Sequence, residues 1–152
     1  MKKRSLFFIS AMLFILVGCS TDEQKMLTCR IGDVSSGENE SREYKIYYTG
    51  DYLDKIQITS IFTGEWDYLQ NMKEAGIKAY DSQNNDYGGF VYDYEILFDT
   101  LTEKITIDYT KVNVKKYFDD NPSSIGELNS DKTKITWKSA KKEYEKAGAT
   151  CE

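Results

Sequence analysis

Residues 44–62, YKIYYTGDYLDKIQITSIF, predict the centre of the fold. Gly50-Asp51, near the middle of this stretch, is a tight-turn signal. Apolar side chains recur at every second position on both sides of this turn: Tyr44, Ile46 and Tyr48 before it, and Ile56, Ile58 and Phe62 after it. Such alternation is typical of strands that bury one face. The stretch therefore predicts a β-hairpin with strands at 44–49 and 53–62.

More strands are predicted on both sides of this hairpin. Residues 90–98, FVYDYEILF, alternate clearly, and the side expected to face the core carries Phe90, Tyr92, Tyr94, Ile96 and Phe98. Thr102-Glu103 is predicted to turn the chain into a strand at 104–109. A first strand is predicted at 27–31, joined to the hairpin by a polar loop at 33–43. The alternation indicates an antiparallel sheet with one solvated face.

Three segments have helical features. The first begins at Thr63 or Gly64, has apolar residues three and four apart as far as Tyr80, and is expected to end in a polar loop at 81–89. A short helix is predicted at 112–118. A last helix is predicted at 139–147, with these expected features: Ala140, Tyr144 and Ala147 inward, and Gly148 as the C-terminal cap. The predicted fold is α+β, an antiparallel β-sheet of about five strands with two or three helices packed on one face, in the order β-β-β-α-β-β-α-α.

The N-terminus has the features of an export signal. Three basic residues, Lys2, Lys3 and Arg4, precede an apolar run at 6–17. This run is shorter than the ~20 residues that span a bilayer as a stable helix. Its end, Leu16-Val17-Gly18-Cys19, resembles a bacterial lipobox. The alternative is an ordinary cleaved signal followed by an unrelated cysteine.

The lipobox reading predicts where the protein is held. Residues 1–18 are removed as a lipoprotein signal peptide, Cys19 carries the lipid, residues 19–26 form a tether and residues 27–152 form a single domain. Two acyl chains anchor a protein firmly, whereas one gives only marginal binding. We expect the domain at the extracytoplasmic face of the cell membrane, or at the outer membrane if the cell has two membranes, because Ser20 and not Asp follows the cysteine.

Composition excludes several classes of function. Without residues 1–18 the chain has 17 basic and 25 acidic residues, a net charge of −8. Such a domain repels phosphate backbones, so nucleic acid is not expected as a partner. The chain has no histidine, which excludes Ser-His-Asp and Cys-His catalysis and His-ligated zinc. It also has no Gly-rich phosphate loop, serine nucleophile elbow or Cys-x-x-Cys pair, and no cofactor is expected.

Two cysteines remain once Cys19 carries lipid. Cys29 and Cys151 lie at opposite ends of the domain, and an even pair in an exported protein favours a disulfide. In the chain-entropy model, closing so long a loop stabilises the fold by up to ~4–5 kcal/mol. The alternative is a pair of buried free thiols.

Four stretches together resemble the YehR-like family of small bacterial lipoproteins of unknown function. They are the lipobox at 16–19, YKIYYTGDYLDKIQI at 44–58, KITIDYTKV at 104–112 and AKKEYEKAGATC at 140–151. The resemblance covers most of the mature chain and implies a β-rich domain with helices, displayed on the cell envelope. It implies no catalytic residues, since the family has no assigned active site. The acidic loop at 33–43 departs from the family pattern.

Two kinds of oxygen-rich feature are candidate chemical sites. The carboxylates Asp93, Glu95, Asp99 and Asp108 are expected on the solvated sheet face, where a pair at the right separation could cleave a glycosidic bond. A solvated face also explains them. The segments 81–86 and 119–121 could hold calcium, but the first does not fit the EF-hand pattern, and turn chemistry explains both. The sequence therefore predicts no metal site.

The aromatic residues Tyr47, Tyr87 and Trp137 are candidates for a binding surface, since the pattern does not place them inside or outside the core. The sequence as a whole predicts a membrane-anchored envelope lipoprotein that is not an enzyme. Its predicted role is to bind a protein partner or a small envelope ligand. The alternative is a carboxylate-dependent envelope hydrolase that acts on a glycan.

Overall fold

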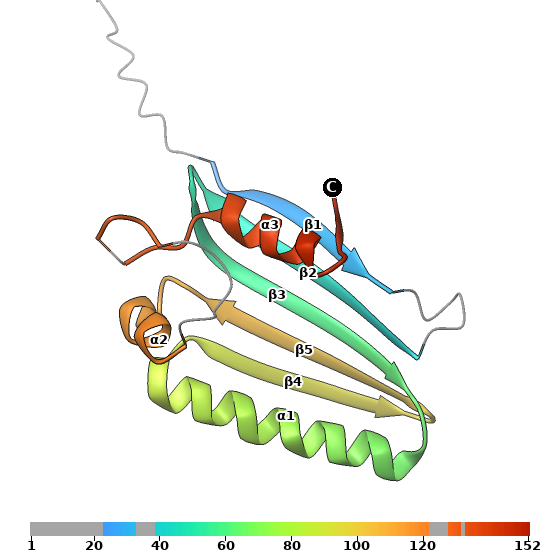
Figure 1. Ribbon diagram of the computed structural model, residues 1–152. Helices are drawn as coiled ribbons and strands as arrows, with labels where there is room; N and C mark the ends of the chain where they lie inside the picture. The colour runs from blue at the N-terminus through green and yellow to red at the C-terminus, as the bar shows by residue number, and fades with distance from the viewer. Residues whose placement is uncertain (1–22, 33–38, 122–127, 132) are drawn as a thin grey trace, which may run out of the picture.

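The computed structural model describes residues 23–32, 39–121, 128–131 and 133–152. It shows a six-stranded antiparallel sheet in the order β4-β5-β3-β2-β1-β6, with three helices (Figure 1). The strands are β1 Lys25–Ile31, β2 Glu40–Thr49, β3 Tyr52–Thr63, β4 Phe90–Leu97, β5 Thr100–Asp108 and β6 Thr150–Cys151. The helices are α1 Trp66–Tyr87, α2 Val114–Asp120 and α3 Trp137–Lys146. The predicted α+β class is confirmed.

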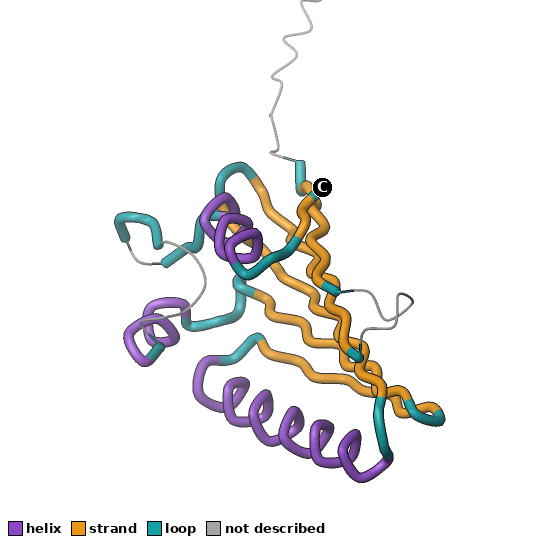
Figure 2. The backbone as a smooth tube through the Cα atoms, turned by 45° about the vertical axis from the view of Figure 1, so that its right-hand side comes forward, coloured by secondary structure: helices purple, strands orange, loops and turns teal. Residues whose placement is uncertain are grey.

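All three helices lie on one side of the sheet, as Figure 2 shows. The register brings the apolar positions of neighbouring strands onto that side: Tyr44 pairs with Ile58, Ile46 with Ile56, and Ile58 with Ile105. The opposite side carries polar and charged side chains such as Lys45, Gln57 and Lys104. The predicted hairpin and its one-sided burial are therefore confirmed.

Two clusters of buried residues fill the space between sheet and helices. In the larger cluster α3 packs Tyr144 against Tyr44 of β2, with ring centroids 4.2 Å apart. In the smaller one Leu69 of α1 packs against Phe62 and Leu101. Burying such side chains stabilises a fold by about 1.5–3 kcal/mol each. α1 and α3 are therefore held over opposite ends of the strand order.

The first helix differs from its prediction at both ends. Thr63 still belongs to β3, and α1 begins only at Trp66, after Glu65. The predicted polar loop at 81–89 is wrong, because α1 continues to Tyr87. Nearly all the polar side chains at 81–86 point to solvent, which an amphipathic helix tolerates. The helix ends at Gly88, whose positive φ of 73° suits glycine.

The turn between β4 and β5 is also shifted. It lies at Phe98-Asp99 and not at Thr102-Glu103, which are inside β5. Phe98 has a positive φ of 57° and is 93% exposed, so the prediction that it faces the core is wrong. Tyr94, also predicted inward, is 48% exposed. Because the turn lies four residues earlier than predicted, Glu103 belongs to β5 and lies on the helix side of the sheet.

Smaller corrections concern the ends of the domain. β1 starts at Lys25, two residues before the predicted strand, and β2 starts at Glu40, inside the predicted loop at 33–43. Ala147 is exposed, whereas Ala149 is buried, because α3 ends at Lys146. Of the residues at 19–26, only 23–26 are described, and the signal at 1–18 and Cys19 lie outside the described residues.

The sixth strand was not predicted. β6 pairs Cys151 with Cys29 of β1, and the two cysteines form a disulfide. Thr28 and Glu152 exchange two backbone hydrogen bonds of 3.0 and 2.9 Å beside it. The cysteines thus occupy a non-hydrogen-bonded pair, where side chains lie closest. The predicted disulfide is confirmed, and it fixes the C-terminus to the first strand.

In the part of the chain that the structure describes, no helix is long and apolar enough to span a membrane.

Candidate functional site

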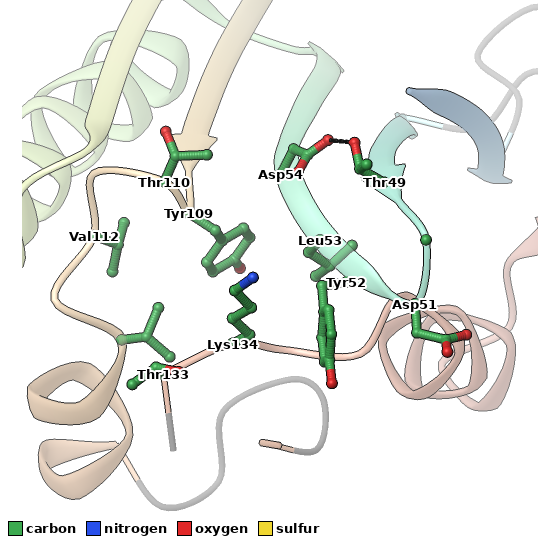
Figure 3. A pocket seen from close by; sticks show the side chains of 12 residues that line it. Thr49, Asp51, Tyr52, Leu53, Asp54, Tyr109, Thr110, Val112, Thr133 and Lys134 are labelled. Atoms are coloured by element: carbon green, nitrogen blue, oxygen red, sulfur yellow. Dashed lines mark hydrogen bonds between the residues drawn. The ribbon is translucent and has the colours of Figure 1, made fainter. Parts of the chain in front are cut away.

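A pocket of about 810 Å³ lies at the end of the sheet where β2 turns into β3 (Figure 3). Its walls come from three segments that are distant in sequence: the β2–β3 turn at 49–54, the connection from β5 to α2 at 109–114, and residues 133–134. A volume in this range suits a small ligand. The pocket is the candidate functional site of the described chain.

Backbone hydrogen bonds hold the three walls together. The amide of Leu53 donates to the carbonyl of Ile135 over 2.9 Å, and Tyr52 forms a β-bridge with Thr136. The amide of Tyr109 donates to the carbonyl of Asp54, also over 2.9 Å. Side chains on these walls are therefore positioned by the sheet itself and not by independent loops.

The pocket combines an apolar floor with polar side chains. Its buried apolar members are Leu53, Val112 and Val114. Lys134 places its Nζ 5.1 Å from the centre of the Tyr52 ring, a cation–π contact. Lys134 itself is exposed. The aromatic ring can stack on the face of a polar ligand, and the cation can bind the oxygen atoms of that ligand.

Asp54 is the polar centre of the turn side of the pocket. Its Oδ2 accepts hydrogen bonds from Thr49 Oγ1 at 2.7 Å, drawn in Figure 3, and from Gln24 Nε2 at 2.9 Å. Gln24 immediately precedes β1, so this contact links the start of the described domain to the pocket. Across the pocket, burial raises the pKa of Tyr109 above its ordinary value.

Of the four carboxylates proposed for hydrolysis, the structure brings only Asp93 and Glu95 together, two residues apart on one face of β4. Asp93 and Glu95 lie on the exposed side of β4, and Asp99 lies in the turn. Asp108 lies opposite the start of β4, about four residues or ~13 Å along the strands from Asp93. Hydrogen bonds from Lys111 and Thr110 lower the pKa of Asp108, the opposite of what a general acid needs.

The two segments weighed for calcium have other roles. Residues 81–86 belong to α1. At the end of α2, Asp119 pairs with Lys115 at 2.7 Å and Asp120 with Lys116 at 2.6 Å. Among the described residues, no three or more Asp, Glu, Cys or His side chains are grouped so as to hold a metal ion.

The three aromatic candidates lie on different parts of the molecule. Tyr47 is on the sheet face opposite the helices, where its hydroxyl donates to Gln57 at 2.9 Å. Tyr87 and Trp137 pack against the main core cluster, at the end of α1 and the start of α3. Trp137 also stacks on Tyr48, with ring centroids 4.4 Å apart. A binding role for these three stays a prediction.

Sequence reasoning missed the pocket residues because turns and connections carry no periodic signal. It also missed Glu103, which is only 7% exposed and accepts a 2.6 Å hydrogen bond from the Tyr92 hydroxyl. This contact and burial raise the pKa of Tyr92. A signal for Glu103 existed: it occurs at the same two-residue period as Leu101, Ile105 and Ile107.

Comparison with solved structures places this arrangement among known folds. The chain has the fold of E. coli YehR. Its model matches the NMR structure of that protein with a TM-score of 0.59 at 13% identity, covering 86% of this chain and 92% of YehR. It also matches the NMR structure of a protein from Streptococcus pneumoniae TIGR4, with a TM-score of 0.53 at 12% identity over 100% of this chain and 99% of that one. No family model matches the sequence, and no curated protein matches it.

The likeness to YehR agrees with the resemblance seen in the sequence. At 12–13% identity it shows a shared fold and carries no ligand or catalytic residue over to this chain. The pocket therefore has to be interpreted from its own side chains.

Proposed function

We propose that this chain is a lipid-anchored protein of the cell envelope that binds a small polar ligand without transforming it. Three observations support this proposal: the lipobox ending at Cys19, the Cys29–Cys151 disulfide and the pocket beside the β2–β3 turn. Disulfides persist in oxidising compartments outside the cytosol, which fits an extracytoplasmic domain.

The composition of the pocket is the observation that carries the proposed binding role. An aromatic wall at Tyr52, the cation of Lys134 and several hydroxyl groups surround an apolar floor. Sugar rings present an apolar face and a polar rim of hydroxyl groups. A glycan fragment of the envelope is therefore the ligand class that this set of side chains suits best.

The pocket also lies on the anchor side of the domain. At most ~3.6 Å of chain per residue separates Cys19 from Glu23, so a lipid on Cys19 is within ~14 Å of Glu23 along the chain. Gln24 then bonds to Asp54 in the pocket wall. A ligand in this pocket is bound close to the membrane.

Binding is tested with the mature, lipidated protein in nanodiscs and with purified cell-wall glycan fragments as the probe. Lys134→Ala is expected to weaken binding at least tenfold, measured by calorimetry. Lys142→Ala is the matched control, since Lys142 is also exposed but does not line this pocket. Equal binding by the wild type and the Lys134 variant contradicts the assignment of the pocket.

The same mixture tests the absence of turnover. We expect mass spectrometry to recover the fragments intact after long incubation with the protein. Cleaved fragments would favour the alternative of an envelope hydrolase, and their loss in single Asn or Gln variants of the four carboxylates would identify the catalytic group.

Anchoring has a test of its own. Cys19→Ala is expected to abolish incorporation of labelled palmitate and to release the protein from the membrane fraction. Retention of the variant in that fraction after a high-salt wash contradicts the lipobox interpretation.

A further inference from the structure

Strand β4 is the outermost strand at one end of the sheet order, and among the residues that the structure describes no strand lies beyond it (Figure 1). The amide of Asp108 donates to the carbonyl of Gly89 at the start of its pairing with β5. Hydrogen bonding alternates along an antiparallel pair. The backbone groups that point away from β5 are therefore those of Phe90, Tyr92, Tyr94 and Ile96.

Of these outward backbone groups, helix α1 provides a hydrogen-bond partner to the amide of Phe90. The amide of Phe90 donates to Asn84 Oδ1 at 3.1 Å. Among the described residues, the outward backbone groups of Tyr92, Tyr94 and Ile96 have no hydrogen-bond partner. An edge strand with such a row of free donors and acceptors is a template for another strand.

Exposed apolar side chains are concentrated on this same strand and its turn. Val91 is 54% exposed, Tyr94 48%, Leu97 56% and Phe98 93%. Phe98 also holds a positive φ that an aromatic residue rarely adopts, although it makes no buried contact. Exposed apolar groups gathered in one place indicate an interaction site and not general surface variation.

The outer row of β4 has a definite charge pattern. Val91, Asp93, Glu95 and Leu97 share the face opposite the helices, so the row is apolar, acidic, acidic, apolar. Within the described residues neither Asp93 nor Glu95 forms an ion pair. A strand added beside β4 places its own side chains directly opposite these four.

We propose that the free edge of β4 binds an extended peptide segment of a partner protein by strand addition. The segment carries two Lys or Arg residues, spaced two apart, between apolar residues. Backbone hydrogen bonds to Tyr92, Tyr94 and Ile96 supply affinity, and the two cations opposite Asp93 and Glu95 supply specificity. This site is separate from the pocket and does not depend on it.

The charges disfavour a second copy of this chain as the occupant in the pairing registers centred on residues 93–95. Directly opposite residues in an antiparallel pair share a face. A two-fold axis at Tyr94 sets Asp93 against Glu95 of the other copy, twice. An axis at Asp93 or at Glu95 sets that carboxylate against itself. Each of these registers pairs like charges, whereas a basic segment pairs opposite ones.

The test uses the mature lipidated protein in nanodiscs and the synthetic peptide Ac-TVTKTKTV-NH2 as the probe. This peptide repeats the proposed pattern on one face. We expect saturable binding with a Kd below about 1 mM, together with NMR shift changes and slowed hydrogen exchange at the amides of Tyr92, Tyr94 and Ile96. The charge-reversed peptide Ac-TVTETETV-NH2 is expected to bind at least tenfold more weakly.

Two controls separate strand addition from general charge attraction. N-methylation of the probe's alternate amides that face β4 removes their hydrogen bonds at unchanged charge, and we expect it to abolish binding. The double variant Asp93→Lys, Glu95→Lys is expected to reverse the preference between the two peptides. Glu74→Lys, Asp81→Lys adds the same charge at exposed positions of α1 and is expected to keep the preference.

Several outcomes overturn the proposal. Equal binding of the two peptides, or of the methylated probe, shows that backbone pairing at this edge does not decide recognition. Concentration-dependent dimerisation with shifts at the same three amides assigns the edge to a second copy. No shift at these amides with about 1 mM probe shows that the acidic residues only keep the edge from pairing.

Discussion

At one edge of the sheet, β6 has two residues and ends in the Cys29–Cys151 disulfide, whereas at the other edge β4 has eight residues, of which Tyr92, Tyr94 and Ile96 have outward backbone groups without a hydrogen-bond partner among the described residues. A short edge strand gives another chain little to pair with. A long edge strand with exposed apolar side chains is available for pairing with another strand. We call the β6 edge, where the C-terminal strand pairs with β1, the closed edge, and the β4 edge, which lies beside α1, the open edge.

A helix that covers the face of an edge strand does not thereby satisfy the backbone groups along its edge. α1 packs on β4 through the contact of Tyr92 with Gly76, and Ile96 of β4 packs against the cluster that contains Leu69. Among the described residues, α1 reaches the edge backbone only at Phe90. α3 and β6 secure the opposite side through Tyr144 and the disulfide. Changes on the two sides should therefore have different consequences.

The largest effect is expected at the closed edge. Replacing both cysteines, Cys29→Ala with Cys151→Ala, should lower the free energy of unfolding by about 3–5 kcal/mol, because the disulfide closes a loop with a sequence separation of 122. Urea unfolding measures the loss. Reduction of the wild type should reproduce it and add two daltons to the intact mass. A loss under about 1 kcal/mol would show that the disulfide does not secure this edge.

A smaller loss is expected beside the open edge. Tyr92→Phe removes the hydrogen bond to the buried Glu103 and should cost about 1–3 kcal/mol. Gly76→Ala should act on the same contact, since an added Cβ would lie 2.4 Å from the Tyr92 hydroxyl oxygen. Glu74→Ala, at an exposed position of α1, is the control. If Gly76→Ala instead stabilised the protein by ~1 kcal/mol, as in a free helix, the packing described for Tyr92 would be wrong.

High pH should lower the free energy of unfolding through Tyr144, which packs near the closed edge. Burial raises the pKa of its hydroxyl well above the usual 10. The stability that follows from a raised pKa is fully present below pH 10 and is lost as pH rises toward the folded-state pKa. Between pH 10 and 11 the free energy of unfolding should fall by up to about 1.4 kcal/mol per protected tyrosine. Tyr144→Phe should show a shallower fall than the wild type in urea unfolding, and an identical slope would contradict this assignment.

The smallest expected effect is a gain at the tip of β4. Phe98→Asn should stabilise the domain by about 0.5–1 kcal/mol, because Asn tolerates positive φ better than Phe and no packed contact is lost. Thermal unfolding detects such a change. A loss of stability would mean that the Phe98 ring supports the fold, which its 93% exposure does not indicate.

Sequence reasoning identified the elements that have a period and missed the features that depend on long-range contact. The hairpin at 44–62 and the one-sided sheet follow from alternation, and the disulfide follows from the number of cysteines. The polar run predicts a loop at 81–89 because Asn and Asp favour turns, but α1 continues to Tyr87 and is stabilised by packing elsewhere along the helix. β6 has too few residues for any pattern.

The candidate sites were less predictable for the same reason. The pocket joins segments around positions 50, 110 and 134, which only the fold brings together. The free edge depends on strand order, and alternation within β4 does not reveal which neighbour is missing. The sequence does contain the alternating residues Val91, Asp93, Glu95 and Leu97. Their charge pattern indicates a binding site only once β4 is known to be an edge strand.

Hydrogen exchange of the wild-type backbone amides, followed by NMR, tests the contrast between the two edges most directly. We expect fast exchange at Tyr92, Tyr94 and Ile96, slow exchange at their neighbours Val91, Asp93 and Glu95, and slow exchange at Thr28 and Glu152 beside the disulfide. Equal protection of all six β4 amides would contradict this expectation, because the edge would then already be paired in the protein alone.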